Sequence, residues 1–330
     1  MSVGAFSADW LALREPADAR ARSADLVNML RESSASCGSG FSRVGLEESR
    51  LKPLPQGTLT QGTLTQRPLP QLKPTPQEPT QIVDLGAGTG ANLRYLAPRL
   101  GGRQEWLLID SDRALLAAAD ARLRDWAVTL DARVETVANR ISITAASFSV
   151  AVRTQELDMA HELAALPLPR GCLVTASALL DLVSRAWLEA LADACRTAHA
   201  SVLFALTYDG RMTLEPAEHD DDLARGLFNR HQRKDKGFGP ALGPDAAAAT
   251  KAAFANRGYM LETAASDWRL GRNEQRLQAA LIDGWLAAAL EIEPASSLQL
   301  KRWCAAHRTR IDAGESTAVV GHTDLAGIAP

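Results

Sequence analysis

The chain has 330 residues, 46% of them hydrophobic and 23% charged, so it is long enough to bury a large core. Its formal net charge of −3 gives no electrostatic reason to expect nucleic acid or an acidic membrane surface as a partner. No apolar stretch approaches the ~18 residues of a membrane-spanning helix, and Asp9 stands where a secretory signal would be apolar. Four scattered cysteines without a CxxC pair (Cys37, Cys172, Cys195 and Cys304) favour free thiols in the cytoplasm.

The first 32 residues have a helical pattern. Apolar residues recur at helical spacing from Trp10 to Leu30. Pro16 interrupts this pattern, and because proline is favoured in the first turn of a helix, we expect a second helix to begin there. We therefore predict an N-terminal helical cap over residues 1–32.

Residues 33–80 differ in composition from the rest of the chain. Small polar residues are followed by a Pro-rich stretch, in which residues 56–60 are repeated immediately as residues 61–65. Such a segment can be a polyproline site for a partner, or a solvated flexible insertion or linker. The composition favours the second interpretation, because no mechanism attaches to the tandem copy.

Strands and helices alternate from residue 81 onward, which is typical of a parallel sheet covered on both faces. We expect strands at residues 81–85, 106–109, 149–154, 172–175, 200–207, 259–264 and 316–321. We expect helices at residues 92–100, 113–127, 158–166, 179–198, 245–257, 273–290 and 295–311. The polar residues 208–243 interrupt the alternation, so we predict an insert on the substrate side of a domain that spans residues 81–330.

A glycine-rich turn joins the first of these strands to its helix. Gly86, Gly88 and Gly90 remove side chains where the backbone bends sharply and where a ligand comes close. The helix that begins near Asn92 presents free N–H groups and a positive dipole end to whatever lies above the turn. The turn fits the dinucleotide pattern G-x-G-x-x-G/A, and it also carries an acidic residue, Asp84, two positions before G-x-G-x-G.

The second pattern resembles motif I of the class I S-adenosylmethionine-dependent methyltransferases, and the resemblance covers roughly residues 80–330. It implies an α/β fold of three layers, α/β/α, around a mainly parallel seven-stranded sheet whose last strand is antiparallel. It also implies an enzyme that takes S-adenosyl-L-methionine as its cofactor. The chain lacks the N/D-P-P-Y/F sequence of family members that methylate amines or bases, which argues against a nucleic-acid base as the acceptor.

The resemblance assigns cofactor contacts to residues at the ends of the strands. Asp84 would orient the turn and, through water, the amino group of the cofactor. Asp110, 20 residues beyond Gly90, would accept both ribose hydroxyls; alternatively it caps the next helix together with Ser111 and Asp112. The full predicted set is Asp84, Gly86, Ala87, Gly88, Gly90, Asn92, Asp110, Ser111, Asp158, Ala176 and Ser177.

Three members of that set lie further along the chain. In the family, an acidic residue such as Asp158 often contacts the adenine amino group, although Asp158 can equally cap a short helix. Ala176 and Ser177 follow the fourth predicted strand, beside the position of the transferable methyl group.

Residues that align the acceptor are expected on loops above the carboxyl ends of the strands. His231 has an ordinary pKa suited to a general base, or it lies on the surface of an amphipathic helix at residues 228–234. We predict His231 and Tyr208 as catalytic residues. The predicted acceptor-binding set is Trp10, Arg14, Asp181, Tyr208, His231, Asp235 and Lys236, with core packing as the alternative for Trp10 and a polar helix surface for Asp181.

A metal ion is the next question, because Asp209 and the acidic run at residues 220–222 resemble the magnesium ligands of catechol-type methyltransferases. The matching carboxylate after the fourth strand is replaced by Ala176. We therefore predict no metal.

Three functions remain open from the sequence. The chain can be a methyltransferase for a small-molecule acceptor, an NAD(P)-dependent oxidoreductase, or a non-catalytic protein that binds the cofactor. Asp84 and the order of the last strands favour the first. An antiparallel last strand would distinguish the methyltransferase from the oxidoreductase.

Overall fold

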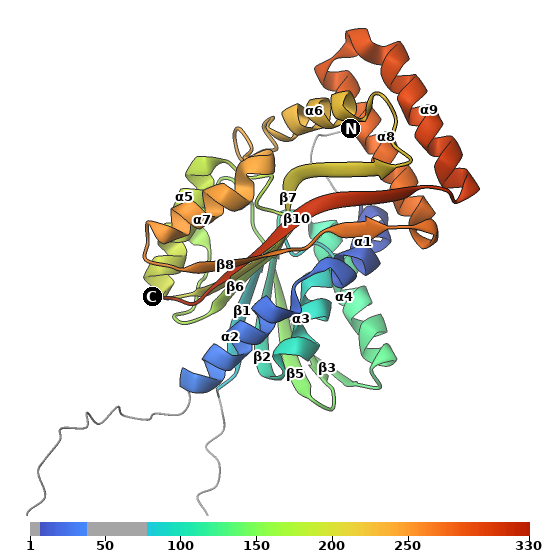
Figure 1. The fold of residues 1–330 in the computed structure, drawn as a ribbon. Helices are drawn as coiled ribbons and strands as arrows, with labels where there is room; N and C mark the ends of the chain where they lie inside the picture. The colour runs from blue at the N-terminus through green and yellow to red at the C-terminus, as the bar shows by residue number, and fades with distance from the viewer. Residues whose placement is uncertain (1–6, 38–77) are drawn as a thin grey trace, which may run out of the picture.

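The computed structural model describes residues 7–37 and 78–330, and side chains for residues 7–33 and 78–330. This part of the chain folds around one sheet with helices on both faces (Figure 1). Its strands are β1 (Thr80–Leu85), β2 (Gly102–Asp110), β3 (Arg133–Val137), β4 (Arg140–Thr144), β5 (Phe148–Glu156), β6 (Leu173–Ser177), β7 (Ser201–Glu215), β8 (Leu261–Ala265), β9 (Trp268–Leu270) and β10 (Thr317–Gly327).

The helices form three groups around this sheet. They are α1 (Ala8–Ala21), α2 (Ala24–Cys37), α3 (Ala91–Leu100), α4 (Arg113–Thr129), α5 (Arg185–Ala198), α6 (Asp221–Gln232), α7 (Ala246–Ala255), α8 (Gln275–Ile292) and α9 (Ser297–Ala313). Residues of α2, α3 and α4 share a buried cluster with one face of the sheet, and residues of α5 and α7 share one with the other face (Figure 1). A third cluster joins α1, α6, α8 and α9 to the far ends of β7 and β10.

The strand order is β3–β4–β5–β2–β1–β6–β7–β10–β8, with β9 also paired to β10. Strands β5, β2, β1, β6 and β7 are parallel, whereas β10 runs antiparallel to β7 and to β8. The predicted α/β/α fold with an antiparallel last strand is therefore confirmed. The predicted number of seven strands is wrong for the described residues, because the β3–β4 hairpin extends one edge and β9 is separate from β8. The hairpin was missed because β3 is largely exposed and lacks an apolar repeat.

Strand β7 is much longer than predicted and takes up the first part of the predicted insert at residues 208–243. The strand continues to Glu215, because Met212 and Leu214 alternate inward against the third cluster. The remainder of the insert contains α6 and the turns that follow it. Residues 208–215 are thus sheet, not a loop above the strands.

The N-terminal helices divide at a different residue from the one predicted. Helix α1 runs through Pro16 to Ala21, so the prediction that a helix begins at Pro16 is wrong. A proline inside a helix removes one backbone hydrogen bond, and here the packing of α1 outweighs that loss. The chain turns instead at Ser23, whose hydroxyl accepts the Leu26 N–H at 3.4 Å. Helix α2 then continues past the predicted end of the cap at residue 32, while residues 38–77 of the predicted flexible segment lie outside the described residues.

Two further predicted helices are shorter than expected. The prediction at residues 158–166 is wrong: only a short 3-10 helix, Leu163–Ala165, forms there. The helix predicted from residue 179 begins at Arg185, where the Ser184 hydroxyl accepts the Trp187 N–H at 3.2 Å. Leu179, Leu180 and Val183 precede it as irregular chain whose side chains are buried in the core, so their apolar character does not reflect a helix face.

Asp324 on the last strand joins three distant parts of the chain. Its carboxylate accepts the N–H of Ser23, between α1 and α2, at 2.9 Å and the N–H of Leu206 at 2.8 Å. Leu206 lies within β7 in the left-handed backbone region, with φ of 55°. The β7–β10 register shifts around this point, and Asp324 binds the amide that the irregularity leaves free. The side chain is buried, so these bonds are shielded from water.

No helix in residues 7–37 or 78–330 is long and apolar enough to cross a bilayer. Cys172, Cys195 and Cys304 are buried free thiols, as predicted for them.

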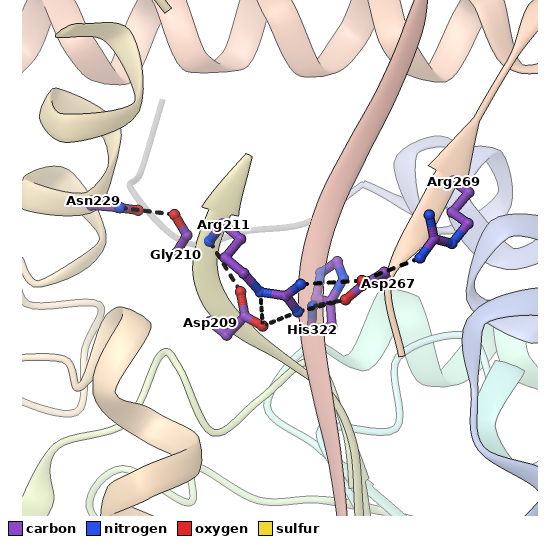
Figure 2. Close-up of polar contacts among 7 residues, drawn as sticks. All are labelled: Asp209, Gly210, Arg211, Asn229, Asp267, Arg269 and His322. Carbon is purple, nitrogen blue, oxygen red and sulfur yellow. Dashed lines mark hydrogen bonds and ion pairs between the residues drawn. The ribbon is translucent and has the colours of Figure 1, made fainter. Parts of the chain in front are cut away.

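An ion-pair network fastens the far end of the β7–β10 ribbon to β9 (Figure 2). Arg211 binds Asp209 at 2.5 Å and Asp267 at 2.7 Å, and the Asp267 carboxylate also accepts the N–H of His322 at 3.3 Å. Figure 2 shows the Arg211 side chain crossing β10 between the two carboxylates. The crossing needs a residue without a side chain at Gly321, because a Cβ there would clash with Asp209 and would lie 2.7 Å from the Arg211 Cβ.

We expect Gly321→Ala to reduce the free energy of unfolding by about 1–3 kcal/mol, because the added methyl group forces the network apart. Urea denaturation of the purified protein measures this change. Gly284→Ala is the matched control: Gly284 lies on the exposed side of α8 with open space around it, so alanine should be neutral or stabilising. Equal midpoints for Gly321→Ala and the wild type would contradict the steric argument.

Candidate active site

The candidate site lies at the carboxyl ends of β1, β2 and β6. The chain order reverses between β1 and β6, since β1 leads to β2 and β5 on one side while β6 and β7 follow on the other. In open α/β sheets, such a switch point leaves a crevice above the strand ends. The glycine turn that follows β1 lies at this crevice.

The glycine turn has the conformation that its sequence requires. Gly86, Gly88 and Gly90 all have positive φ, at 63°, 52° and 75°. Gly90 is the residue before α3, and its N–H binds the Ala87 carbonyl at 2.8 Å. The Ala87 N–H in turn binds the Ile109 carbonyl at 2.9 Å, which fixes the turn against the end of β2.

Asp110 supports the turn from the end of β2. Its carboxylate accepts the Gly88 N–H at 2.8 Å and the Asp112 N–H at 2.9 Å. Of the three residues in the capping alternative, Asp112 caps α4 by accepting the N–H of Ala114 at 2.8 Å. The alternative is wrong for Asp110, which binds the backbone of the turn and of the cap residue instead. Burial raises the pKa of Asp110 above its usual range. The bond to Gly88 places the Asp110 carboxylate directly beside the turn. Ser111, which lies between Asp110 and Asp112 in the sequence, is exposed.

A chain of buried polar side chains runs beneath the turn. Asn92 donates to the Asp84 carboxylate at 2.6 Å and to the Thr175 hydroxyl at 3.1 Å. The Asn92 carbonyl oxygen accepts a hydrogen bond from Arg22 at 2.7 Å. The second carboxylate oxygen of Asp84 has no partner in the structure, and neither have Nε and Nη2 of Arg22. This row of hydrogen-bonded side chains thus has an unsatisfied acceptor at one end, on Asp84, and unsatisfied donors at the other end, on Arg22.

Burial shifts the pKa values of Asp84 and Arg22, the two ends of this row of side chains, in the direction that favours the neutral form of each. It raises the pKa of Asp84 to about 7, although the hydrogen bond from Asn92 and the charge of Arg22 act in the opposite direction. It also lowers the pKa of Arg22, against the attraction of Asp324, Tyr95 and Asp84. The loss of hydration outweighs the ionic attraction in both cases. A ligand that brings complementary charge would relieve both penalties.

Helix α1 covers the glycine turn. The terminal Cδ1 of Leu11 lies 3.0 Å from where a Cβ on Gly88 would stand. Glu15 binds the guanidinium of Arg94 on α3 with two hydrogen bonds, of 2.9 and 2.7 Å, and Arg94 also donates to the Thr89 carbonyl at 2.7 Å. These contacts hold α1 against the first turn of α3.

A cavity of about 230 Å³ lies between α1 and α3 beside the turn. Asp18 and Arg22 line it from α1, Asn92 lines it from α3, and Ser177 lines it from the end of β6. A larger cavity of about 420 Å³ lies on the opposite face of α1, next to Arg20, Asp267 and Arg269. The smaller cavity is the candidate cofactor site, because only it contains residues of the predicted cofactor set, Asn92 and Ser177.

The remaining members of that set lie in two environments. Ala176 is buried on β6 opposite Leu85 of β1. Asp158 is exposed, and its carboxylate accepts the Ala160 N–H at 3.0 Å and contacts His161 at 2.9 Å. Asp158 thus shapes its own turn but caps no helix, because the only helix nearby among the described residues, Leu163–Ala165, begins after Glu162. Contact of Asp158 with adenine stays a prediction.

Several predicted acceptor residues gather near the start of the β7–β10 ribbon. Arg14 and Lys236 are far apart in the sequence, yet the positive charge of each lies close enough to Asp181 to lower its pKa. Burial dominates, however, and raises that pKa to about 6, and one oxygen of Asp181 has no partner in the structure. Tyr208 is buried nearby and donates to Asn229 at 2.7 Å. Burial raises the pKa of the Tyr208 phenol, so this group stays protonated at neutral pH.

His231, Asp235 and Trp10 have local partners. His231 lies on α6 and contacts Glu291 at 3.1 Å and Lys236 at 3.3 Å; burial, followed by the charge of Lys236, lowers its pKa. The exposed Asp235 accepts the N–H groups of Gly237 and Gly239, which shapes its own turn. Trp10 packs against the third hydrophobic cluster, which is the core-packing alternative.

The acidic residues considered as metal ligands are engaged elsewhere. Asp209 pairs with Arg211, and Asp221 accepts hydrogen bonds from Trp303 at 2.7 Å and contacts His307 at 2.7 Å. Within the described part of the chain, no three His, Cys, Asp or Glu side chains are grouped as metal ligands. The absence of a metal requirement stays a prediction.

Three residues of the site were not found from the sequence: Arg22, Glu15 and His322. The first two lie on α1 and its C-terminal boundary, and their partners are 70 or more residues away, so no local pattern marks them. His322 lies within β10 beside Tyr208 and Trp268. Burial lowers its pKa to about 3, and its Nδ1 has no partner.

Comparison with known proteins agrees with this position of the site. The family model described as a methyltransferase domain matches residues 82–170, which include the glycine turn and Asp110. This match confirms the predicted resemblance to the class I methyltransferases. A search of curated proteins finds no match.

The solved structures that match this chain have low sequence identity to it. A methyltransferase from Geobacter sulfurreducens in complex with S-adenosyl-L-homocysteine is 17% identical over 77% of this chain and 86% of its own, with a TM-score of 0.38. The YcgJ protein of Bacillus subtilis is 14% identical over 76% and 93%, with a TM-score of 0.41. The cyclopropane synthase MmaA2 of Mycobacterium tuberculosis is 13% identical over 76% and 79%, with a TM-score of 0.38.

We expect the stability of the wild type to fall, relative to Asp84→Asn, as the pH rises from about 4 to 7. Over this range the unfolded state has lost the Asp84 proton, whereas burial keeps it bound in the folded state, whose pKa is about 7. The difference should grow by on the order of 1 kcal/mol per pH unit and level off above pH 7. Urea denaturation of both proteins across this range measures it. Asp181 titrates in both proteins, so its contribution cancels in the difference between their unfolding free energies. If that difference did not vary with pH, it would contradict the raised pKa of Asp84.

Proposed function

We propose that this chain is an S-adenosyl-L-methionine-dependent methyltransferase that acts on a small-molecule acceptor in the cytoplasm. The observation that carries the proposal is the Asp84–Gly90 turn, which lies at the switch point of the sheet with Asp110 bound to its backbone. The match of residues 82–170 to a methyltransferase domain supports the same assignment.

The residues at the turn fit this cofactor. Asp110 already accepts two backbone N–H groups, yet each carboxylate oxygen retains a lone pair for a ribose hydroxyl. Gly86 and Gly88 leave the backbone open to close approach. The unsatisfied oxygen of Asp84 and the adjoining cavity at Asn92 and Ser177 provide polar contacts on the side of α1.

The cofactor supplies a methyl group on a sulfonium, which is activated for in-line displacement. The protein therefore has to align an acceptor and exclude water, and it removes a proton where the acceptor requires it. Asp181 is our candidate for the last role. Its pKa of about 6 lets it accept a proton near neutral pH, and one oxygen is free of protein partners.

The burial of the acceptor residues supports a small acceptor. Arg14, Asp181 and Tyr208 are 9%, 7% and 5% exposed. An acceptor that reaches such largely buried side chains is more easily a small molecule than a nucleic-acid duplex or a folded protein surface. The net charge of −3 also gives no attraction for nucleic acid.

Calorimetric titration with S-adenosylmethionine, S-adenosylhomocysteine and NAD tests the cofactor assignment. We expect binding of the two adenosyl compounds, and Asp110→Ala should weaken it at least about tenfold, because charge-assisted hydrogen bonds to the ribose are lost. The matched control is Asp112→Ala, which removes the cap of α4 two residues away and should leave the affinity nearly unchanged. Binding of NAD alone would overturn the proposal.

We expect Leu11→Ala to speed the association of S-adenosylhomocysteine. The 230 Å³ cavity is smaller than the roughly 300–1,000 Å³ of typical ligand pockets, and the Leu11 side chain lies on the turn at Gly88. Removing that side chain should widen the entrance, which stopped-flow measurements of the association rate constant detect. Leu13→Ala is the control, since Leu13 packs against the third hydrophobic cluster. A slower association of Leu11→Ala would mean that Leu11 helps to bind the ligand.

A further inference from the structure

Strand β3 forms an open edge of the sheet. It pairs with β4, and the described part of the chain places no other strand beside it (Figure 1). Four of its five residues are exposed, and the strand contains neither a proline nor a bulge, two devices that protect exposed strand edges. At the other margin of the sheet, by contrast, α2 and α7 contact β8.

The turn of the β3–β4 hairpin decides which backbone groups point outward. Val137 and Arg140 pair with each other across a turn of two residues. The residues that flank such a turn form a hydrogen-bonded pair, and hydrogen-bonded pairs alternate with open pairs along an antiparallel ladder. Val134 and Thr136 therefore direct their N–H and C=O groups away from β4, toward the open edge.

One face of β3 carries two opposite charges. Arg133 and Glu135 are two residues apart and so lie on the same face of the sheet. Their side chains are 78% and 54% exposed and bind each other at 2.5 Å. Across the hairpin they are paired with Thr144 and Ser142, which are uncharged. Both charges are thus accessible to a strand that pairs with the open edge.

Exposed apolar side chains gather at the same edge. Val128, Leu130 and Val137 are 79%, 37% and 73% exposed, and they are three of the six large exposed hydrophobic side chains among the described residues. Arg124, one helical turn before Val128, donates to Thr136 of β3 at 3.1 Å. The side of α4 that carries Val128 therefore faces the edge. An open strand beside exposed apolar side chains is a surface to which another strand can pair.

We propose that β3 pairs with the β3 strand of a second copy of this chain, in an antiparallel dimer with Val134 on the two-fold axis. This register joins the outward backbone groups of Val134 to those of the same residue in the partner. It also sets Arg133 of each copy opposite Glu135 of the other, in an open pair, where side chains lie closest. With Glu135 on the axis instead, two like charges would lie opposite each other. The edge is thus complementary in charge to a second copy of itself.

The same axis also brings the α4 helices together. A two-fold axis perpendicular to the sheet keeps each face of the sheet on its own side, so α4 of one copy comes beside α4 of the other. The exposed Val128 of each copy then lies toward the partner. The dimer is independent of the proposed function, since β4, β5 and β2 lie between this edge and β1.

Sedimentation equilibrium of the full-length protein tests the dimer. The wild type should be dimeric at about 100 μM, a concentration at which even weak specific association is detected. Arg133→Glu and Glu135→Arg should each weaken the dimer at least about tenfold, because two cross-strand pairs change from attraction to repulsion. An equimolar mixture of the two variants should regain the wild-type affinity, because the new carboxylate of one then lies opposite the new guanidinium of the other. Arg308→Glu is the control, since it reverses an exposed charge on α9, paired with Asp283 at 3.0 Å, away from this edge.

A wild type that stays monomeric at this concentration overturns the proposal, and that measurement needs no variant. A dimer whose affinity is the same in the wild type and in both variants also overturns it, because the copies would then associate through another surface. Variants that are weakened alone and are not restored by mixing overturn the pairing of Arg133 with Glu135, because the loss would then come from damage to the hairpin.

Discussion

The docking of α1 against the beginning of α3 is the interaction on which the candidate site depends. The Glu15–Arg94 ion pair and the Arg22–Asn92 hydrogen bond both cross this contact. They bring side chains of the N-terminal cap to the glycine turn, whose own backbone contacts are all made by residues that follow β1. Without α1, the glycine turn would keep its backbone geometry, but it would lose the cation, the enclosing wall and the cavity beside it.

This docking has an electrostatic cost that the structure meets only in part. Asp84, Arg22 and Asp181 are buried with atoms that no protein group satisfies. A protein that only needed stability would replace such groups by apolar ones, because buried charges are weak sources of stability. Buried polar groups with shifted pKa values are instead typical of functional sites, and Arg22 also lines the candidate cofactor cavity.

The parts of the fold that the sequence predicted are those governed by local rules. The strand, turn and helix at residues 81–94 follow from apolar spacing and from glycines at positive φ, so both the turn and its cofactor class could be inferred. Most strand positions, and the antiparallel last strand, followed from hydrophobic periodicity together with the family resemblance. The position of Asp110 beside the turn could be inferred from its spacing, whereas its contact with a ribose stays a prediction.

The parts that were missed depend on contacts between distant residues. The extension of β7 to Glu215 requires β10 as a partner, about a hundred residues later, and nothing in residues 208–215 shows that partner. Pro16 was interpreted as a break because its own preference is clear, whereas the packing that keeps α1 continuous comes from other elements. Arg22 looked like one arginine among many, and only its burial against Tyr95 and Asn92 sets it apart.

Asp324 has a consequence for how the protein folds. The bond between Ser23 and Asp324 joins residues 301 positions apart, so the first helices and β10 depend on each other. The junction between α1 and α2 is therefore completed only after β10 has been synthesised, and long-range contacts of this kind slow folding. Without β10, the first helices would lose this anchor, although their own residues are the first to leave the ribosome.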